Sequence, residues 1–97
     1  MSRPQLLSER EIEDQLTDFP LWIRESSLIV KETVCTNFPT VIGLVNSIAL
    51  IAEKLDHHPD LLIYGWNKLR ITLSTHDRGG LTELDFKMAK QIDDIKF

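Results

Sequence analysis

The sequence predicts an α+β domain in which a four-stranded antiparallel sheet carries three helices packed on one face. Three observations lead to this fold class. Capping boxes that begin at Ser8 and Thr82 open two helices, and an apolar period of three and four marks a third helix between them. The intervening segments form two pairs of strands, each pair joined by a short turn and therefore antiparallel.

The first helix is expected from about Glu9 to Thr17, because Ser8 at the N-cap and Glu11 at the third helical position form a capping box. Strands are then expected over 22–25 and, in a stretch rich in β-branched residues, over 28–35. A two-serine turn separates these strands, so they should pair as a hairpin.

The long helix is expected over 38–55, with Asn37 as its N-cap. Its apolar face has the clearest period in the chain: Val41, Leu44, Val45, Ile48, Ala49, Ile51, Ala52 and Leu55. Two further strands, 61–66 and 69–75, surround a glycine-containing turn, and Thr82 then opens the last helix.

Length and charge bound the function. The 97 residues fit one domain, 1–97, and a core of this size favours a homo-oligomer. The formal charge of -4 argues against direct binding to nucleic acid or to an anionic membrane. Residues 1–9 lack the apolar core of a secretory signal, and no apolar run approaches the roughly 18 residues of a membrane span. Cys35 stands alone and fits a reducing compartment, so a cytoplasmic location is expected.

All three histidines lie in two short segments, His57-His58 after the long helix and His76 after the last strand. Histidine is the side chain that ordinarily titrates near neutral pH, so proton transfer is the first chemical hypothesis. Glu53 precedes His57 by four residues, and its carboxylate would orient the His57 ring if the helix continued that far. The alternative for this pair is a simple ion pair at the end of the helix.

A metal site is the rival hypothesis, and His57, His76 and Asp85 could form its ligand set. No HxxxH or CxxC spacing supports such a site, so no metal is expected. Asp85 has a structural alternative as the capping residue of the last helix. Trp66 could belong to the core or provide a stacking platform for a flat heterocycle.

Four segments together resemble the pterin-4a-carbinolamine dehydratases, a family also known in animals as a dimerisation cofactor of a homeodomain transcription factor. These segments are Glu53-Lys54-Leu55-Asp56-His57-His58-Pro59, the aromatic Trp66, Thr72-Leu73-Ser74-Thr75-His76, and Gly80-Leu81-Thr82-Glu83-Leu84-Asp85. The resemblance covers roughly residues 22–95. It implies a homodimer or homotetramer, and dehydration of 4a-hydroxytetrahydrobiopterin to quinonoid dihydropterin without metal or organic cofactor.

The resemblance also implies site residues. His57, His58, His76 and Glu53 are the implied catalytic group, with His57 and His76 as the proton-transfer pair, His58 orienting the pterin and Glu53 tuning His57. Trp66, Thr75 and Asp85 are the expected substrate contacts. The implied role is to recycle the cofactor of aromatic amino-acid hydroxylases. The alternative is a noncatalytic module on the same fold that binds a pterin or a protein partner.

Overall fold

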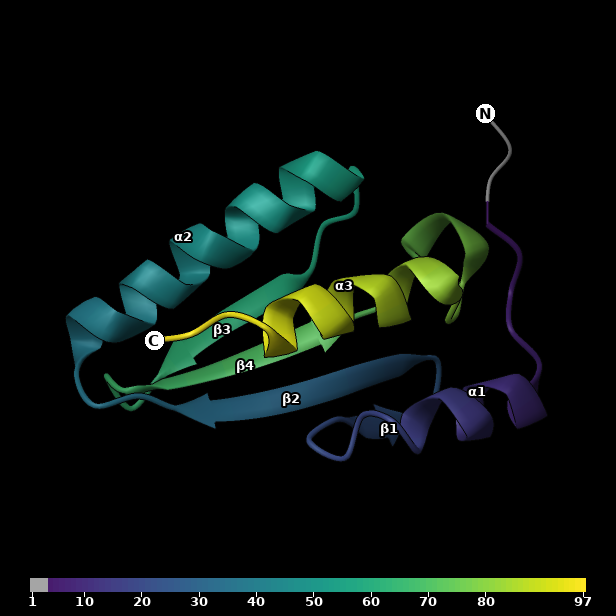
Figure 1. Cartoon of the computed structure of the whole chain (residues 1–97), viewed down its shortest axis with the longest axis horizontal. Helices are drawn as coiled ribbons and strands as arrows, with labels where there is room; N and C mark the ends of the chain where they lie inside the picture. Colours follow the sequence, from purple (N-terminus) through teal and green to yellow (C-terminus); the bar gives the residue numbers. More distant parts are fainter. Residues whose placement is uncertain (1–3) are drawn as a thin grey trace.

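The computed structural model describes residues 4–97, so the first three residues of the segment considered for a secretory signal lie outside it. The predicted fold class is confirmed: three α-helices and a four-stranded antiparallel sheet follow one another in the expected order (Figure 1). Their bounds are α1 Glu9–Leu16, β1 Ile23–Glu25, β2 Leu28–Val34, α2 Phe38–Leu55, β3 Asp60–Tyr64, β4 Lys68–Leu73 and α3 Glu83–Asp93. A short 3-10 turn that the sequence did not predict, η1 (His76–Arg78), follows β4.

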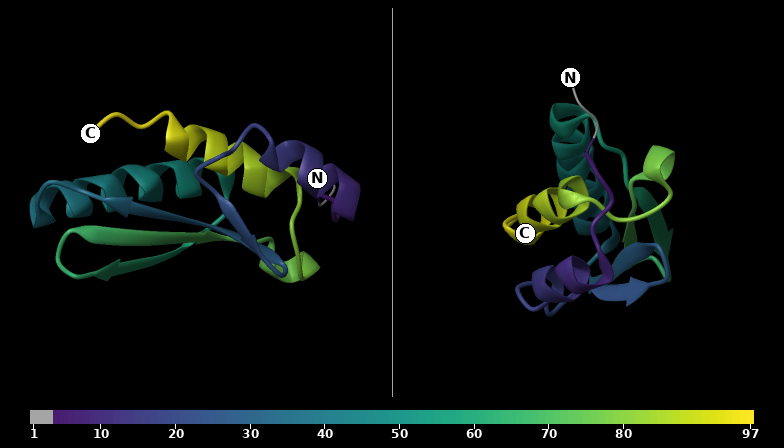
Figure 2. Two further views of the ribbon diagram at one scale, coloured as in Figure 1. Left: turned by 90° about the horizontal axis from the view of Figure 1, so that it is seen from below. Right: turned by 90° about the vertical axis from the view of Figure 1, so that its right-hand side faces the viewer.

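The strands lie in the order β1-β2-β4-β3, with every neighbouring pair antiparallel. The two predicted hairpins are therefore joined through β2 and β4, whose register runs from Ile29 opposite Leu73 to Val34 opposite Lys68. Views from two further directions place the helices on the same side of the sheet (Figure 2). The loops that leave α2 and β4 and the start of α3 meet near one end of this sheet.

The core lies between the inner face of the sheet and the helices. β4 alternates buried and partly exposed residues, as expected for a strand with one covered face. α2 and α3 each contribute one apolar stripe to the same core. The central side chains are Ile29, Leu69, Ile71 and Leu73 from the sheet, Val41, Leu44 and Ile48 from α2, and Phe86, Met88 and Ala89 from α3.

Helix α2 corrects one expectation from the sequence. With 18 residues and a mean hydropathy of 1.4, it is the one helix among residues 4–97 that is long and apolar enough to cross a membrane. The expectation that no segment reaches this length and composition is therefore wrong. Core helices of globular proteins can satisfy the same criterion, and α2 packs its inward stripe into the core of this domain.

The C-terminal end of α2 decides where the histidine pair points. Asp56 adopts a left-handed conformation with φ 50° and ψ 46°, which stops the helix. The backbone N–H of His57 then donates to the carbonyl oxygen of Ala52 at 3.1 Å, closing the last turn. The helix thus ends before His57, and the chain turns so that His57 and His58 leave it in different directions.

This turn yields a stability prediction. Substituting Asp56→Gly removes the steric cost of a left-handed residue and should raise the free energy of unfolding by about 0.5–1 kcal/mol, whereas Asp56→Val should lower it by about 1 kcal/mol. Urea denaturation measures both changes. Ser26 is also left-handed, with φ 56°, and lies away from α2. Ser26→Gly is therefore the control that makes the same type of substitution at a position remote from this helix end. Loss of stability in Asp56→Gly would contradict this account of the helix end.

Candidate functional site

A buried polar network lies where the end of α2, the end of β4 and the start of α3 meet. Its centre is the carboxylate of Asp85, which is fully buried. Asp85 Oδ1 lies 2.6 Å from Nε2 of His57. Asp85 Oδ2 accepts from the hydroxyl of Thr75 at 2.9 Å and from the backbone N–H of Thr82 at 3.0 Å. The two threonine hydroxyls are themselves 2.7 Å apart.

The members of this network come from three segments of the chain. His57 follows the left-handed turn after α2, and Thr75 forms an isolated bridge with Gly80 beyond β4. Thr82 is the N-cap of α3, and Asp85 is the third residue of the same capping box. Buried polar groups cost free energy unless they are hydrogen-bonded, so this network fixes the three segments relative to one another.

Asp85 is the cap that the sequence predicted, and it also makes a contact with His57 that the sequence did not predict. One oxygen caps α3 by accepting from the Thr82 backbone, and the other binds the His57 ring. Thr75 was expected to contact substrate, but the structure commits its hydroxyl to two protein partners. Thr82 was predicted as the N-cap of the last helix but not as a site residue, because its capping box resembles that of the exposed Ser8.

The prediction that Glu53 contacts the ring of His57 is wrong. The Glu53 carboxylate lies 3.2 Å from Nε2 of His58 and not beneath the ring of His57. The reason is the early end of α2 at Leu55, which removes the four-residue helical spacing on which the prediction depended. Both side chains of the Glu53–His58 pair are mostly exposed, so this contact resembles a surface ion pair more than a buried anchor.

His76 and Trp66 differ in their relation to the network. His76 immediately follows Thr75 and is exposed at the start of η1. Trp66 lies in the turn between β3 and β4, with φ 58° and 63% exposure. This turn is at the end of the hairpin opposite Asp60, about 13 Å along β3 at roughly 3.3 Å per residue. The structure does not bring Trp66 to the histidines within one chain.

Metal ligation was the rival interpretation of these residues. Among residues 4–97, no group of three or more His, Cys, Asp or Glu side chains is arranged to hold a metal ion. The set of His57, His76 and Asp85 therefore does not form a preassembled metal centre. The 2.6 Å contact between Asp85 and His57 instead gives the imidazole a direct carboxylate partner.

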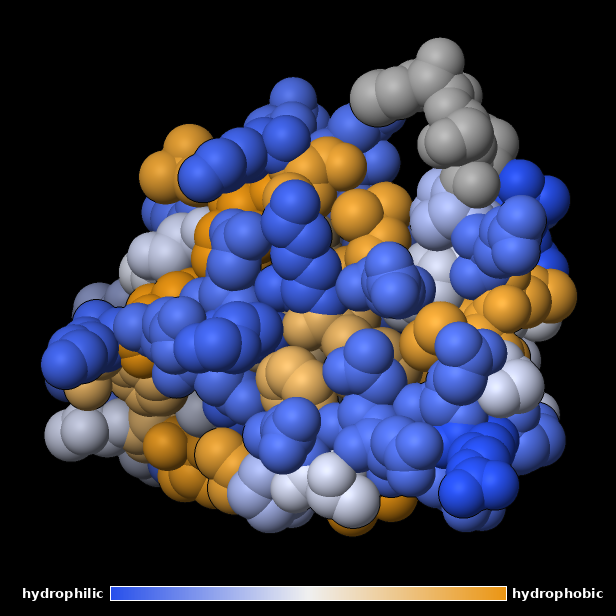
Figure 3. Space-filling model, turned by 45° about the vertical axis from the view of Figure 1, so that its right-hand side comes forward, coloured by the Kyte–Doolittle hydropathy of each residue, from blue (hydrophilic) through white to orange (hydrophobic). Residues whose placement is uncertain are grey.

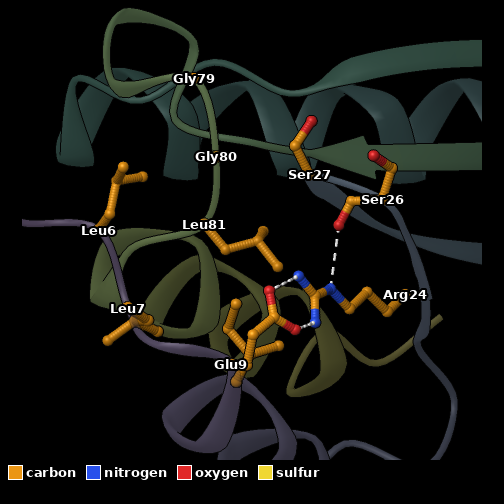
Figure 4. Close-up of a pocket in the computed structure, with 10 residues that line it drawn as sticks. Leu6, Leu7, Glu9, Arg24, Ser26, Ser27, Gly79, Gly80 and Leu81 are labelled. Atoms are coloured by element: carbon orange, nitrogen blue, oxygen red, sulfur yellow. Dashed lines mark hydrogen bonds and ion pairs between the residues drawn. The ribbon is translucent and has the colours of Figure 1, made fainter.

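A groove of about 310 Å³ lies beside the loop that carries η1. Figure 4 shows Leu6 and Leu7 on one side of it, Gly79 to Leu81 behind it, and Arg24 reaching toward Glu9. The guanidinium of Arg24 binds both oxygens of Glu9 and the Ser26 carbonyl oxygen, and this pairing lowers the pKa of Glu9. The histidines are not among its lining residues. Its two charged side chains, Arg24 and Glu9, therefore pair with each other.

Comparison with known proteins gives a consistent result. The family model described as Pterin 4 alpha carbinolamine dehydratase matches residues 5–95. A relative from Chloroflexus aurantiacus named "Putative pterin-4-alpha-carbinolamine dehydratase" is 47% identical over 89 residues, covering 92% of this chain and 95% of that protein. A relative of the same name from Sulfurisphaera tokodaii is 37% identical over 89 residues, with the same coverage of both chains.

Two solved structures share the fold. A transcriptional coactivator/pterin dehydratase from Brucella melitensis has a TM-score of 0.86 and 35% sequence identity, covering 92% of this chain and 96% of its own. A pterin dehydratase-like protein described as a RuBisCO assembly factor in the α-carboxysome has a TM-score of 0.61 and 18% identity, covering 74% and 82%. At that identity the second structure supports the fold alone.

The contrast between the two acidic residues can be tested by stability. Asp85→Ala should lower the free energy of unfolding by about 3 kcal/mol, because it leaves buried donors without an acceptor. Glu53→Ala removes an exposed pair and should change it by less than about 0.5 kcal/mol. Urea denaturation of the two variants gives the comparison. Equal losses would contradict the assignment of Asp85 as the buried anchor and Glu53 as a surface partner.

Proposed function

Because the chain belongs to the pterin-4α-carbinolamine dehydratase family and is a dehydratase of that kind, we propose that its substrate is 4a-hydroxytetrahydrobiopterin. The products are quinonoid dihydropterin and water, formed by histidine general acid–base catalysis. The observation that carries the mechanistic proposal is the buried His57–Asp85 pair. His58 follows His57 in the sequence, and His76 follows Thr75, whose hydroxyl donates to Asp85. The reaction would recycle the cofactor of aromatic amino-acid hydroxylases.

The proposed chemistry requires two proton transfers. The C4a–O bond breaks, and the 4a-hydroxyl leaves as water when an acid supplies a proton to it. The proton on the neighbouring ring nitrogen passes to a base, and the electron pair of that N–H bond forms the C=N bond of the quinonoid product. Imidazoles can serve as both acid and base near neutral pH. We assign this work to His57 and His76, with His58 orienting the pterin.

The corrected position of Glu53 changes one part of this assignment. Its carboxylate contacts His58, so its support acts on the orienting histidine and not on His57. The carboxylate that supports His57 is Asp85. A direct substrate contact by Asp85 or Thr75 is not part of the proposal, because their polar side-chain atoms bind other protein groups. Trp66 contributes to the proposed pterin site only if a second chain brings it to the histidines.

The runner-up is a noncatalytic module that uses the same fold to bind a pterin or a protein. One similar structure, at 35% identity, is titled a transcriptional coactivator/pterin dehydratase, which favours keeping this alternative. The presence of His57, His58, His76 and Asp85 together favours the enzyme. Cytoplasmic location and the absence of direct nucleic-acid binding remain predictions from composition, with a formal charge of -4.

We also propose a homodimer or homotetramer. The outward side of α2 exposes Phe38, Ile42 and Leu50, and Leu50 is 75% exposed. The uncovered face of the sheet adds Ile23, Val34 and Leu62. Figure 3 shows apolar patches between hydrophilic residues on one side of the molecule. Burial of such residues between subunits would supplement the limited core of a short chain.

Catalysis can be tested with synthetic 4a-hydroxytetrahydropterin in a stopped-flow assay. His57→Ala and His76→Ala should each reduce the acceleration over buffer by about 10²-fold, a typical contribution of a general acid or base. His58→Ala should mainly raise KM. Lys90→Ala on the exposed side of α3 is the matched surface control.

Two results would contradict the catalytic proposal. Full dehydration rates in both His57→Ala and His76→Ala would exclude them as the proton-transfer pair. No acceleration by the unmodified protein, with a bound pterin detected by calorimetry, would favour the noncatalytic module.

The subunit proposal makes a separate prediction. Leu50→Glu places a charge on the exposed apolar side of α2 and should shift the protein to a smaller species in light scattering coupled to gel filtration. Leu21→Glu makes the same substitution at another exposed leucine, 63% exposed, and should leave the mass unchanged. A monomeric unmodified protein would contradict the proposal directly.

A further inference from the structure

We propose that the hydroxyl groups of Thr75 and Thr82 are positioning groups that determine which nitrogen of His57 carries the proton. In this arrangement Nε2–H of His57 donates to Asp85, and the other ring nitrogen, Nδ1, is the atom that exchanges a proton with the substrate. The inference rests on the proposed function for its catalytic part. The hydrogen-bond arrangement itself can be tested without substrate.

The donors and acceptors of the network can be counted. An ionised carboxylate only accepts hydrogen bonds, and each threonine hydroxyl has one proton to donate. The Thr75 hydroxyl donates to Asp85 Oδ2, so it cannot also donate to Thr82. The 2.7 Å contact between the hydroxyls is therefore a bond from Thr82 to Thr75, while Thr82 Oγ1 accepts from the backbone N–H of Leu84. Each of the two hydroxyl protons therefore has a single acceptor.

These hydroxyls affect His57 through the charge on Asp85. Two donors on Oδ2, the Thr75 hydroxyl and the Thr82 backbone N–H, stabilise the ionised carboxylate. An ionised Asp85 at 2.6 Å requires a proton on Nε2, because two facing acceptors would repel each other. Without the hydroxyl donor, Asp85 can take up a proton from solvent on Oδ1 and donate it to Nε2, and the neutral ring then carries its own proton on Nδ1.

The second ring nitrogen is available to a ligand. His57 Nδ1 has no hydrogen-bond partner within residues 4–97. Over the same residues, Asn67 Oδ1 is the one buried side-chain nitrogen or oxygen without a partner, so Nδ1 must reach the surface. His57 is 7% exposed, so only a small part of this otherwise buried residue reaches solvent. A neutral ring with Nε2–H presents a lone pair there.

Thr75 and Thr82 should differ in the size of their effects. Thr75 contacts Asp85 directly, and its single proton is the link. Thr82 acts through Thr75 by donating to its oxygen, which leaves the Thr75 proton directed at Asp85. Thr82 also caps α3, so part of any loss in its variants is structural. Thr75 lies outside the helix caps of α3 and gives the cleaner test.

The test measures the His57 tautomer by ¹⁵N NMR of histidine-labelled protein, at a pH where the imidazole is neutral, together with the stopped-flow dehydration rate. The unmodified protein should show His57 as the Nε2–H form. Thr75→Val should add a population of the Nδ1–H form and lower kcat about tenfold, as expected for one lost hydrogen bond. Thr75→Ser keeps the hydroxyl and should have the tautomer and the kcat of the unmodified protein. Asp85→Asn, whose amide can donate to Nε2, provides the reference signal of the Nδ1–H form.

Controls separate this role from general stability. Ser8→Ala removes a similar capping box from α1, which does not touch His57, and should change neither the tautomer nor kcat. If Thr75→Val does not fold, the comparison of Thr82→Val with Thr82→Ser tests the same proposal. The expected change in the His57 tautomer population is then smaller. An unchanged His57 tautomer in the folded valine variant would overturn the proposal whatever its rate. Absence of dehydratase activity in the unmodified protein would refute the proposed function, while the NMR result would still decide the hydrogen-bond arrangement.

Discussion

The buried carboxylate of Asp85 is the constraint on which the site depends. It has no exposure to water and accepts from a histidine ring, a threonine hydroxyl and a backbone N–H. A buried charge that lost these partners would cost several kcal/mol, which is a large fraction of the stability of a small domain. The end of α2, the end of β4 and the start of α3 must therefore meet in one geometry. The orientation of His57 follows from this requirement because the ring supplies one of the partners.

The two acidic residues near the histidines illustrate how burial separates structure from surface chemistry. Asp85 caps a helix and holds an imidazole at the same time, so its stability effect and its chemical effect arise from the same hydrogen bonds. Glu53 and His58 form their contact in water, where an ion pair contributes little to stability. The exposed pair can therefore reorganise at little cost, whereas the buried His57–Asp85 pair is held in one position.

Much of the fold could be predicted because it depends on local signals. Capping boxes, paired strands and apolar periods gave the order of every helix and strand, with most boundaries within two residues. The contacts of the site were harder to predict from the sequence. The Glu53–His57 prediction failed because a left-handed Asp56 ends α2, and aspartate at that position carries no strong signal of such a turn. Thr82 and Ser8 begin similar capping boxes, and only the tertiary structure buries one of them beside a histidine.

The position of His76 follows from how its loop is held at both ends. On one side, Thr75 is tied to Asp85, and its backbone N–H donates to the carbonyl oxygen of Gly80 at 2.9 Å. On the other side, Leu7 donates its backbone N–H to the carbonyl oxygen of Leu81 at 2.9 Å, and a Cβ at Gly80 would lie 3.0 Å from the Leu6 side chain. The short turn between these anchors has little freedom at its base, although His76 itself is exposed. An exposed side chain on such an anchored loop can contact a ligand without the entropic cost of ordering the whole loop.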